Sequence, residues 1–295
     1  MVVYTKKHNG FNAILFLLPA MCIYVFVVVV PAIYSLFLSL FKWNGIGSNV
    51  KKFVGIDNYV HLIFEDSTFK TALMNNTIWT VLSLVLTTFV ALSFAMILNK
   101  QFKFRVIYRG VFYFPYILSG IVVALMWSWI YHPLFGFLNK FLDFVHLEGL
   151  KIGWLSNPHI ALYSVFAAAL WQYVGAPMVI FLAGLQSIPN ELYEASSVDG
   201  ATKWKTFFTI TIPMLKETFV IVIATTLIGS MKVFDIIYAM TGGGPAQSTQ
   251  TMASLMYAQM IKYSNVGLAT AISWILVIVV GVITVPYIMH MAKED

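Results

Sequence analysis

Long apolar stretches alternate with short polar segments along the whole chain. A bilayer core of about 30 Å needs roughly 20 apolar residues in a helix, and each long stretch reaches that length. The pattern predicts an all-α, polytopic membrane protein with six spanning helices in a single transmembrane domain, residues 1–295. The predicted spans are 12–40, 72–98, 107–131, 159–185, 217–240 and 266–290.

Proline or glycine interrupts most of the predicted spans. Membrane helices tolerate these residues where neighbouring groups satisfy the freed backbone, and such interruptions commonly line a cavity. We therefore expect bent helices around a path through the membrane. The interrupting residues are Pro19 and Pro31 in the first span, Pro115 in the third, Gly175 and Pro177 in the fourth, and Gly229 in the fifth.

Composition agrees with a membrane protein and excludes other classes. Hydrophobic residues make up 60% of the chain and charged residues 10%, and the mean hydropathy is +0.82, so a soluble domain is excluded. The net charge of +6 is scattered between apolar segments, which argues against a nucleic-acid partner. The single cysteine, Cys22, rules out an internal disulfide. Because the apolar run after Lys6 and Lys7 exceeds a signal-peptide core, we expect a retained anchor.

Basic residues predict the orientation of the chain. An even number of spans places both termini on one side, and the polar segments of that side hold ten basic residues against seven opposite. The positive-inside rule makes that side cytoplasmic. The ten are Lys6, Lys7, Lys100, Lys103, Arg105, Arg109, Lys203, Lys205, Lys216 and Lys293; the seven are Lys42, Lys51, Lys52, Lys70, Lys140, Lys151 and Lys262.

The cytoplasmic segment 186–216 predicts a helix-turn-helix. Ser187 is a candidate cap, Pro189 suits a first turn, and Glu191 favours the positive end of a helix dipole. Gly200 is expected to end this helix. A second helix is expected over 202–211, ending before Pro213, which cannot continue the hydrogen-bond ladder.

Small residues near the predicted turn would let another backbone approach closely; they are Ala195, Ser196, Gly200 and Ala201. The large apolar residues of the second helix are expected to pack against the transmembrane helices; they are Trp204, Phe207, Phe208, Ile210 and Ile212. Two interpretations follow from the residues alone. The segment is either a docking element for a partner or an interfacial helix resting at the headgroups.

A spaced motif in this segment carries a family resemblance. Glu194-Ala195-Ser196, then Gly200, then Ile210-Thr211-Ile212-Pro213 resembles the EAA loop of binding-protein-dependent ABC importer permeases, whose pattern is EAA, three residues, G, nine residues, I-x-L-P. Ser196 replaces the third alanine and Ile212 the leucine. The stretches SIPNELYEA, VDGA, FDIIYAMTGGGP and VGIDNYVHL resemble the carbohydrate subgroup, above all first-type sugar permeases such as the larger maltose and the glycerol-phosphate and lactose subunits.

The resemblance covers nearly the whole chain and implies a type I importer permease fold. It also implies that the loop forms coupling helices in a cleft of a cytoplasmic ATPase, with Glu194, Ala195, Ser196, Asp199, Gly200 and Ala201 at the contact. No G-x-x-x-x-G-K-[ST] loop is present, since Gly242-Gly243-Gly244-Pro245 lacks the lysine. The chain is therefore expected to be no enzyme and to hold no cofactor, with ATP and Mg bound by the partner ATPase.

The partners implied are a second homologous permease, two ATPase subunits, an extracytoplasmic solute-binding protein, a sugar and membrane lipid. The binding protein is expected to dock on the loops near 42–71, 132–158 and 241–265. The expected location is the bacterial cytoplasmic membrane, with both termini in the cytoplasm.

A path for solute is expected near the middle of the membrane, where helices break. In the fifth span, Thr226, Ser230, Val233 and Ile237 share one face of a continuous helix, and Gly229 leaves a gap. In the fourth, Trp171, Gly175 and Met178 align beside Gln172, around a Gly175-Ala176-Pro177 bend that resembles the corresponding bend of sugar permeases. The alternative is that these small residues only pack helices.

Lys232 and Asp235 are the only charges deep in a predicted span. Three residues apart on one helix, they are expected to form a structural ion pair, or a contact to a partner subunit. The span interiors hold no further carboxylates or histidines for a proton relay, which argues against a proton-coupled secondary transporter. The six histidines lack ligand spacing, so no metal site is expected, and no hydrolase motif supports a membrane enzyme.

The charge distribution favours a neutral solute. Both arginines, Arg105 and Arg109, fall on the cytoplasmic side, which leaves the external half without a planar fork for phosphate or carboxylate. Aromatic residues such as Trp127, Trp129 and Tyr131 are available to stack on sugar faces. A neutral oligosaccharide is the preferred substrate class, and a phosphorylated polyol or glycerol phosphate is the second, because a partner permease could supply basic groups.

Overall fold

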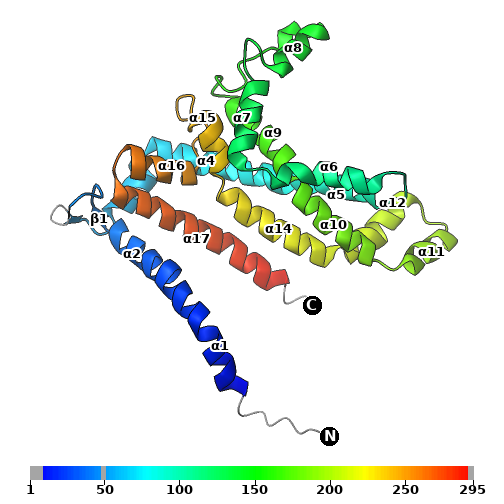
Figure 1. The fold of residues 1–295 in the computed structure, drawn as a ribbon, viewed down its shortest axis with the longest axis horizontal. Coiled ribbons are helices and arrows are strands. Elements are labelled where there is room, and N and C mark those ends of the chain that lie inside the picture. The colour runs from blue at the N-terminus through cyan, green and yellow to red at the C-terminus, as the bar shows by residue number, and fades with distance from the viewer. Residues whose placement is uncertain (1–8, 48–50, 292–295) are drawn as a thin grey trace. The chain divides into compact units, whose positions relative to one another are not determined.

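The computed structural model describes residues 9–47 and 51–291. The sequence-based expectations for Lys6, Lys7 and Lys293 fall outside this part of the chain. Helices account for nearly all of the regular structure (Figure 1). The chain divides into two compact units, residues 1–65 with 256–274, and residues 66–255 with 275–295. Each unit is described by itself.

The first unit begins with the straight candidate span Ile14–Ser39, whose side chains are almost all exposed within this chain. Its elements are α1 (Asn9–Tyr24), a π-helical segment (Val25–Val29), α2 (Val30–Ser39), the antiparallel strands β1 (Phe41–Lys42) and β2 (Lys52–Phe53), α3 (Asp57–Val60) and a π-helical segment (His61–Glu65). Residues 256–274 add the π-helical segment Ala258–Lys262 and the start of α17 (Val266–Met291).

A buried asparagine holds the end of α2 against the following turn. The Asn58 side-chain amide donates to the carbonyl oxygens of Ser39 at 2.7 Å and Phe41 at 3.0 Å. Gly267 lies so close to Phe41 that an added Cβ would overlap its carbonyl oxygen. The Asn58 side chain thus satisfies backbone carbonyls where the helix ends, and Gly267 allows the close approach beside it.

The second unit contains the remaining helices. They are α4 (Ser67–Leu82), a π-helical segment (Ser83–Thr87), α5 (Thr88–Asn99), α6 (Arg105–Ile117), α7 (Gly120–Ile130), α8 (Phe137–Phe144), a 3-10 turn (Glu148–Leu150), α9 (Ala161–Tyr173), α10 (Gly175–Ser187), α11 (Asn190–Val198), α12 (Lys203–Thr206), a π-helical segment (Phe207–Thr211), α13 (Ile212–Met214), α14 (Lys216–Met231), α15 (Asp235–Thr241) and α16 (Met252–Tyr257), which runs on into the first unit.

Three helices within the described residues are long and apolar enough to cross a membrane, and the number rises to six if each of three bent pairs is one span. The straight ones are Ile14–Ser39, Ser67–Asn99 and Val266–Met289. The bent pairs are α6 with α7 at 99°, α9 with α10 at 44°, and the α12–α13 stretch with α14 at 68°. The all-α class is confirmed, and so is the expected bending of the third, fourth and fifth spans. The first span was expected to bend as well, but it continues through Pro19 and Pro31 as a candidate span without a break.

The fifth predicted span is not one helix over 217–240. The α-helix α14 ends at Met231, residues 232–234 are non-helical, and α15 begins at Asp235. We call residues 232–234 the break. A continuous face through Thr226, Val233 and Ile237 therefore does not exist.

Two expected boundaries in the cytoplasmic segment were also wrong. Ser187 is the last residue of α10 and does not cap α11, because its hydroxyl donates back to the Gly184 carbonyl oxygen. The second helix continues past Pro213 to Met214. The π-helical turn that precedes it takes the Ile212 amide back to Phe207, and Pro213 then occupies a first-turn position, where no amide is required.

Helix α10 packs along α5 and α6 and leads towards the α11–α12 end of this unit (Figure 1). Its buried residues Met178, Phe181 and Leu185 meet alanines of α5. Gly175 is required at the start of α10, since an added Cβ would lie 2.7 Å from the Phe112 carbonyl oxygen. A second buried cluster joins α7, α9 and α15.

Candidate functional site

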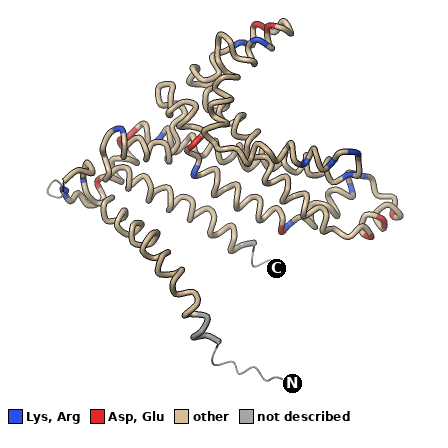
Figure 2. The backbone as a smooth tube through the Cα atoms, viewed as in Figure 1, with Lys and Arg blue, Asp and Glu red and all other residues tan. Residues whose placement is uncertain are grey.

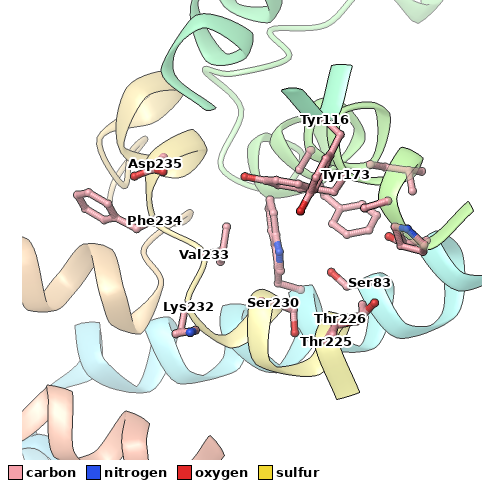
Figure 3. Close-up of a pocket in the computed structure, with 18 residues that line it drawn as sticks. Ser83, Tyr116, Tyr173, Thr225, Thr226, Ser230, Lys232, Val233, Phe234 and Asp235 are labelled. Atoms are coloured by element: carbon pink, nitrogen blue, oxygen red, sulfur yellow. The ribbon is translucent and has the colours of Figure 1, made fainter. Parts of the chain in front are cut away.

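A cavity of about 370 Å³ opens among the helices of the second unit (Figure 3). We call it the solute cavity. Residues of the second, third, fourth and fifth spans and of the break line it. The lining residues are Trp79, Ser83, Thr87, Tyr116, Phe166, Ala169, Leu170, Tyr173, Ala176, Pro177, Thr225, Thr226, Gly229, Ser230, Lys232, Val233, Phe234 and Asp235.

Hydroxyl groups form one wall of the solute cavity. Figure 3 shows Ser83 beside Thr225, Thr226 and Ser230, where the second span faces α14. The Ser230 hydroxyl lies 3.0 Å from Thr80 Oγ1 and 2.9 Å from the Leu227 carbonyl oxygen. Its proton is therefore held by the protein, and its oxygen lone pairs remain the group available to a solute.

Aromatic rings form the opposite wall. Tyr116 and Tyr173 lie across the cavity from the hydroxyls (Figure 3). Trp79, which comes from the second span together with Ser83, meets Phe166 of α9 edge to face, with ring centroids 5.2 Å apart, so the two rings hold each other in place. A wall of rings facing a wall of hydroxyls suits a ligand with apolar faces and polar edges.

Lys232 and Asp235 both line the cavity, but no ion pair joins them among the described residues. Figure 3 places Lys232 at one end of the break and Asp235 at the other. The predicted intramembrane ion pair was therefore wrong, because the helix that would have aligned the two residues is interrupted between them. Both residues instead line the cavity separately.

The sequence-predicted path residues separate into two groups. Thr226, Gly229, Ser230 and Val233 line the cavity. Those of the fourth span do not. Met178 is fully buried in the α5–α10 core, Gly175 packs on α6, Gln172 donates to the Leu118 carbonyl oxygen at 2.9 Å, and Trp171 stacks edge to face on Trp127.

The second span contributes a wall that sequence reasoning missed. Trp79, Ser83 and Thr87 recur every four residues and therefore share one helix face. Their polar groups within a strongly apolar segment were a visible signal. In the fourth span the cavity face is formed by Phe166, Ala169, Leu170 and Tyr173, a neighbouring face to the one predicted, whereas Ala176 and Pro177 of the predicted bend do line the cavity.

The cytoplasmic turn has the geometry that its glycine predicts. Gly200 has φ +70°, its amide bonds to the Ser197 carbonyl oxygen at 3.1 Å, and the Ala201 amide bonds to Ser196 at 3.0 Å. This pair of bonds is a Schellman motif, which ends α11 after Val198. Thr202 then caps α12 by accepting from the Lys205 amide. We call residues 186–216 the coupling loop.

The coupling loop exposes four of its six predicted contact residues, namely Glu194, Ala195, Asp199 and Gly200. Ser196 is buried, and its hydroxyl lies 2.7 Å from Thr206 Oγ1. This bond joins the two short helices, so Ser196 braces the turn. Ala201 is half-buried.

The apolar side of the loop is only partly covered. Phe207, Ile210 and Ile212 pack on the core as predicted. Trp204 is 74% exposed and Phe208 61% exposed, so the expectation that they pack on the transmembrane helices was wrong. Trp204 and Phe208, four residues apart, lie on one face of the helix, and the residues that pack on the core lie on another face.

Comparison with known proteins identifies the family. The family described as "Binding-protein-dependent transport system inner membrane component" matches residues 83–291. The chain belongs to this family. A probable ABC transporter permease protein of Bacillus subtilis is 37% identical over 92% of this chain and 93% of its own length. The trehalose/maltose transport system permease protein of Thermococcus litoralis is 31% identical over 93% and 91%.

The fold of this inner membrane component also matches a solved structure. A chain of a bacterial ABC transporter involved in the import of the acidic polysaccharide alginate superposes with a TM-score of 0.83 at 22% identity, covering 97% of this chain and 96% of that one. The type I importer permease fold and the multi-pass membrane character expected from the sequence are thereby confirmed. Figure 2 shows few charged residues along the helices of the second unit and a cluster at its α11–α12 end.

Proposed function

We propose that this inner membrane component forms half of the translocation path of an ATP-driven sugar importer, most directly for a neutral oligosaccharide. The observation that carries the proposal is the solute cavity, where hydroxyls face aromatic rings beside a broken span. Sugars present apolar faces to rings and hydroxyl edges to polar groups. Relatives whose names state a sugar substrate, such as the multiple sugar-binding permease of Streptococcus mutans, support this class.

The coupling loop is the proposed link to ATP hydrolysis. Glu194, Ala195, Asp199 and Gly200 are exposed at one end of the second unit and would contact a partner ATPase, which binds ATP and Mg. Ser196 and Ala201 would act by holding the turn. In this proposal the chain is no enzyme, both termini are cytoplasmic, and closure of two ATPase subunits moves the α11–α12 end.

The complete importer would contain a second homologous permease and an extracytoplasmic binding protein. The binding protein would dock on the external loops near 42–71, 132–158 and 241–265. Alternating access then opens the cavity outward to receive sugar and inward to release it.

One observation favours a second substrate class. Lys232 lines the cavity without an ion-pair partner among the described residues, so an anionic sugar derivative, such as a phosphorylated polyol, would find one positive charge. Asp235 in the same cavity offsets that charge for a rigid anion, and this keeps the neutral sugar first.

The test is recovery and transport by the assembled importer. The tagged chain is purified from its native membrane in mild detergent, and the eluate is analysed by mass spectrometry and for Mg-ATP hydrolysis. Reconstituted vesicles are then screened for ATP-dependent uptake of neutral and phosphorylated sugars. A homologous permease, an ATPase and sugar uptake are expected. Uptake that an uncoupler abolishes while ATP is maintained would instead indicate a proton-coupled transporter.

A further inference from the structure

The break leaves backbone carbonyls without helical partners inside a predicted membrane span. The last residue of α14 is Met231, and Val233 lies within the break. A carbonyl oxygen unsatisfied in the membrane interior costs several kcal/mol, so a break of this kind requires donors from elsewhere in the chain.

Two buried side chains supply those donors. The Asn76 amide nitrogen, on α4, donates to the Met231 carbonyl oxygen at 3.1 Å. The Thr251 hydroxyl, just before α16, donates to the Val233 carbonyl oxygen at 3.1 Å. Their exposed fractions are 1% and 0%. The two side chains therefore hold the break from two separate elements.

The two donors are also joined to each other. Asn76 Oδ1 accepts the Met252 backbone amide at 2.7 Å, which fixes the segment that carries Thr251. Ser254 Oγ lies 3.2 Å from the Thr251 hydroxyl and 2.8 Å from its backbone amide. The arrangement is a connected and buried polar network, in which each bond orients the next.

The consequence for the cavity lies in the residues around the held carbonyls. Lys232 stands between Met231 and Val233, and Asp235 opens the next helix. If the helix continued, the two side chains would pair at i, i+3 spacing. With the break held, both line the cavity unpaired.

We propose that Asn76 and Thr251 are positioning residues of the solute cavity, which hold the break so that Lys232 and Asp235 present a separate ammonium donor and carboxylate acceptor to the hydroxyls of a sugar. This inference rests on the proposed sugar-transport function for its ligand. The geometry of the break itself does not depend on that function.

The test compares Thr251→Val, which removes the donor at nearly constant volume, with Thr251→Ser, which retains it. Both variants are made in the assembled importer, in a chain that carries Cys22→Ala and Lys232→Cys. The rate at which the new cysteine reacts with a water-soluble maleimide measures the exposure of the break. Thr251→Val is expected to change that rate about tenfold, the equivalent of one buried hydrogen bond. Thr251→Ser is expected to stay within about twofold of the parent.

A second cysteine reports on the sugar. Gly229→Cys, which retains Lys232 and Asp235, is placed in the cavity, where the glycine has no neighbour within 4 Å of an added Cβ. The probe is the neutral sugar found by the uptake screen. The sugar concentration that halves the rate of maleimide labelling should be about tenfold higher in Thr251→Val than in Thr251→Ser. Equal rates and equal protection in the two variants would overturn the proposal.

Asn76→Asp and Asn75→Asp form a matched pair should Thr251→Val fail to assemble. Both asparagines are buried on α4, but Asn75 donates to the carbonyl oxygens of Ser248 and Gln250, outside the break. Asn76→Asp should alter Lys232→Cys labelling more than Asn75→Asp does, because Asn75 bonds only the segment before Thr251. An equal change in both variants counts against the proposal. If the parent importer transports no sugar, the proposed function fails, whereas the labelling rates still decide whether the break is held.

Discussion

Single residues of the solute cavity differ in the contacts that they already make within the protein. Ser230 lies within hydrogen-bond distance of Thr80, whereas Gly229 beside it has open space. Gly175 is as small as Gly229 and Met178 is flexible, but Gly175 packs on α6 and Met178 on α5, so neither lines the cavity. The sequence shows residue type at these positions, but only the helix orientation separates cavity residues from packing residues.

Ser230→Trp should block passage of sugar. The indole would extend into the cavity opposite the aromatic wall, because Ser230 faces it from α14. ATP-dependent uptake is expected to fall to background, while the complex still assembles. Ser230→Ala is the control for the lost hydroxyl and should retain most uptake. Sugar affinity and flux that remain unchanged in Ser230→Trp would remove this face from the path.

Gly200→Asp tests the coupling loop. Gly200 has φ +70° and no neighbour within 4 Å of an added Cβ. Within the chain, a side chain at this position costs only about 1 kcal/mol of backbone strain. A larger loss of function would therefore come from a clash with a partner. We expect loss of ATPase recovery with the tagged chain, with normal membrane insertion. Gly55→Asp is the control, since Gly55 has φ +58° and equal open space outside the coupling loop. Full ATPase recovery with Gly200→Asp contradicts docking at this turn.

At the scale of elements, the sequence predicted the spans and the bend at Gly175 between α9 and α10, but it did not predict the break in the fifth span. Hydropathy cannot predict the break at 232–234, because the side chains that donate hydrogen bonds to its carbonyl oxygens, Asn76 and Thr251, lie far away in the sequence. Pro213 was expected to end a helix, and the π-helical turn before it instead carries the helix on to Met214. The turn at Gly200 was predictable, since a left-handed residue after a helix strongly favours glycine.

The contact between α6 and α10 predicts a stability difference between two glycines. Gly175→Ala would place a methyl 2.7 Å from the Phe112 carbonyl oxygen, so the helices must separate at a cost of about 1–3 kcal/mol. Gly229→Ala enters open space and should be neutral or slightly stabilising, because alanine favours a helix. Thermal unfolding in one detergent, followed by circular dichroism, compares the two. Equal midpoints would mean that α6 and α10 do not pack this closely.

At the scale of the whole molecule, the sequence motif and the family match both indicate the inner membrane component of a binding-protein-dependent transport system. Its two proposed sites lie in the same unit, the solute cavity among the helices and the coupling loop at the α11–α12 end. Because α10 and α14 both run between them, movement of the loop has a direct mechanical route to the cavity walls. This route requires that the loop and the external segments lie on opposite sides of the membrane.

That requirement predicts a labelling pattern. With Cys22 replaced by alanine, Glu148→Cys and Lys203→Cys each place one thiol at an exposed position, the first between α8 and α9 and the second in the coupling loop. A membrane-impermeant maleimide added to intact cells should modify Glu148→Cys and spare Lys203→Cys, and permeabilised cells should show modification of both. The positive-inside rule sets this direction, since the segments with Lys100, Arg105 and Lys203 are the more basic. Modification of Lys203→Cys in intact cells would reverse the orientation and separate the loop from any cytoplasmic ATPase.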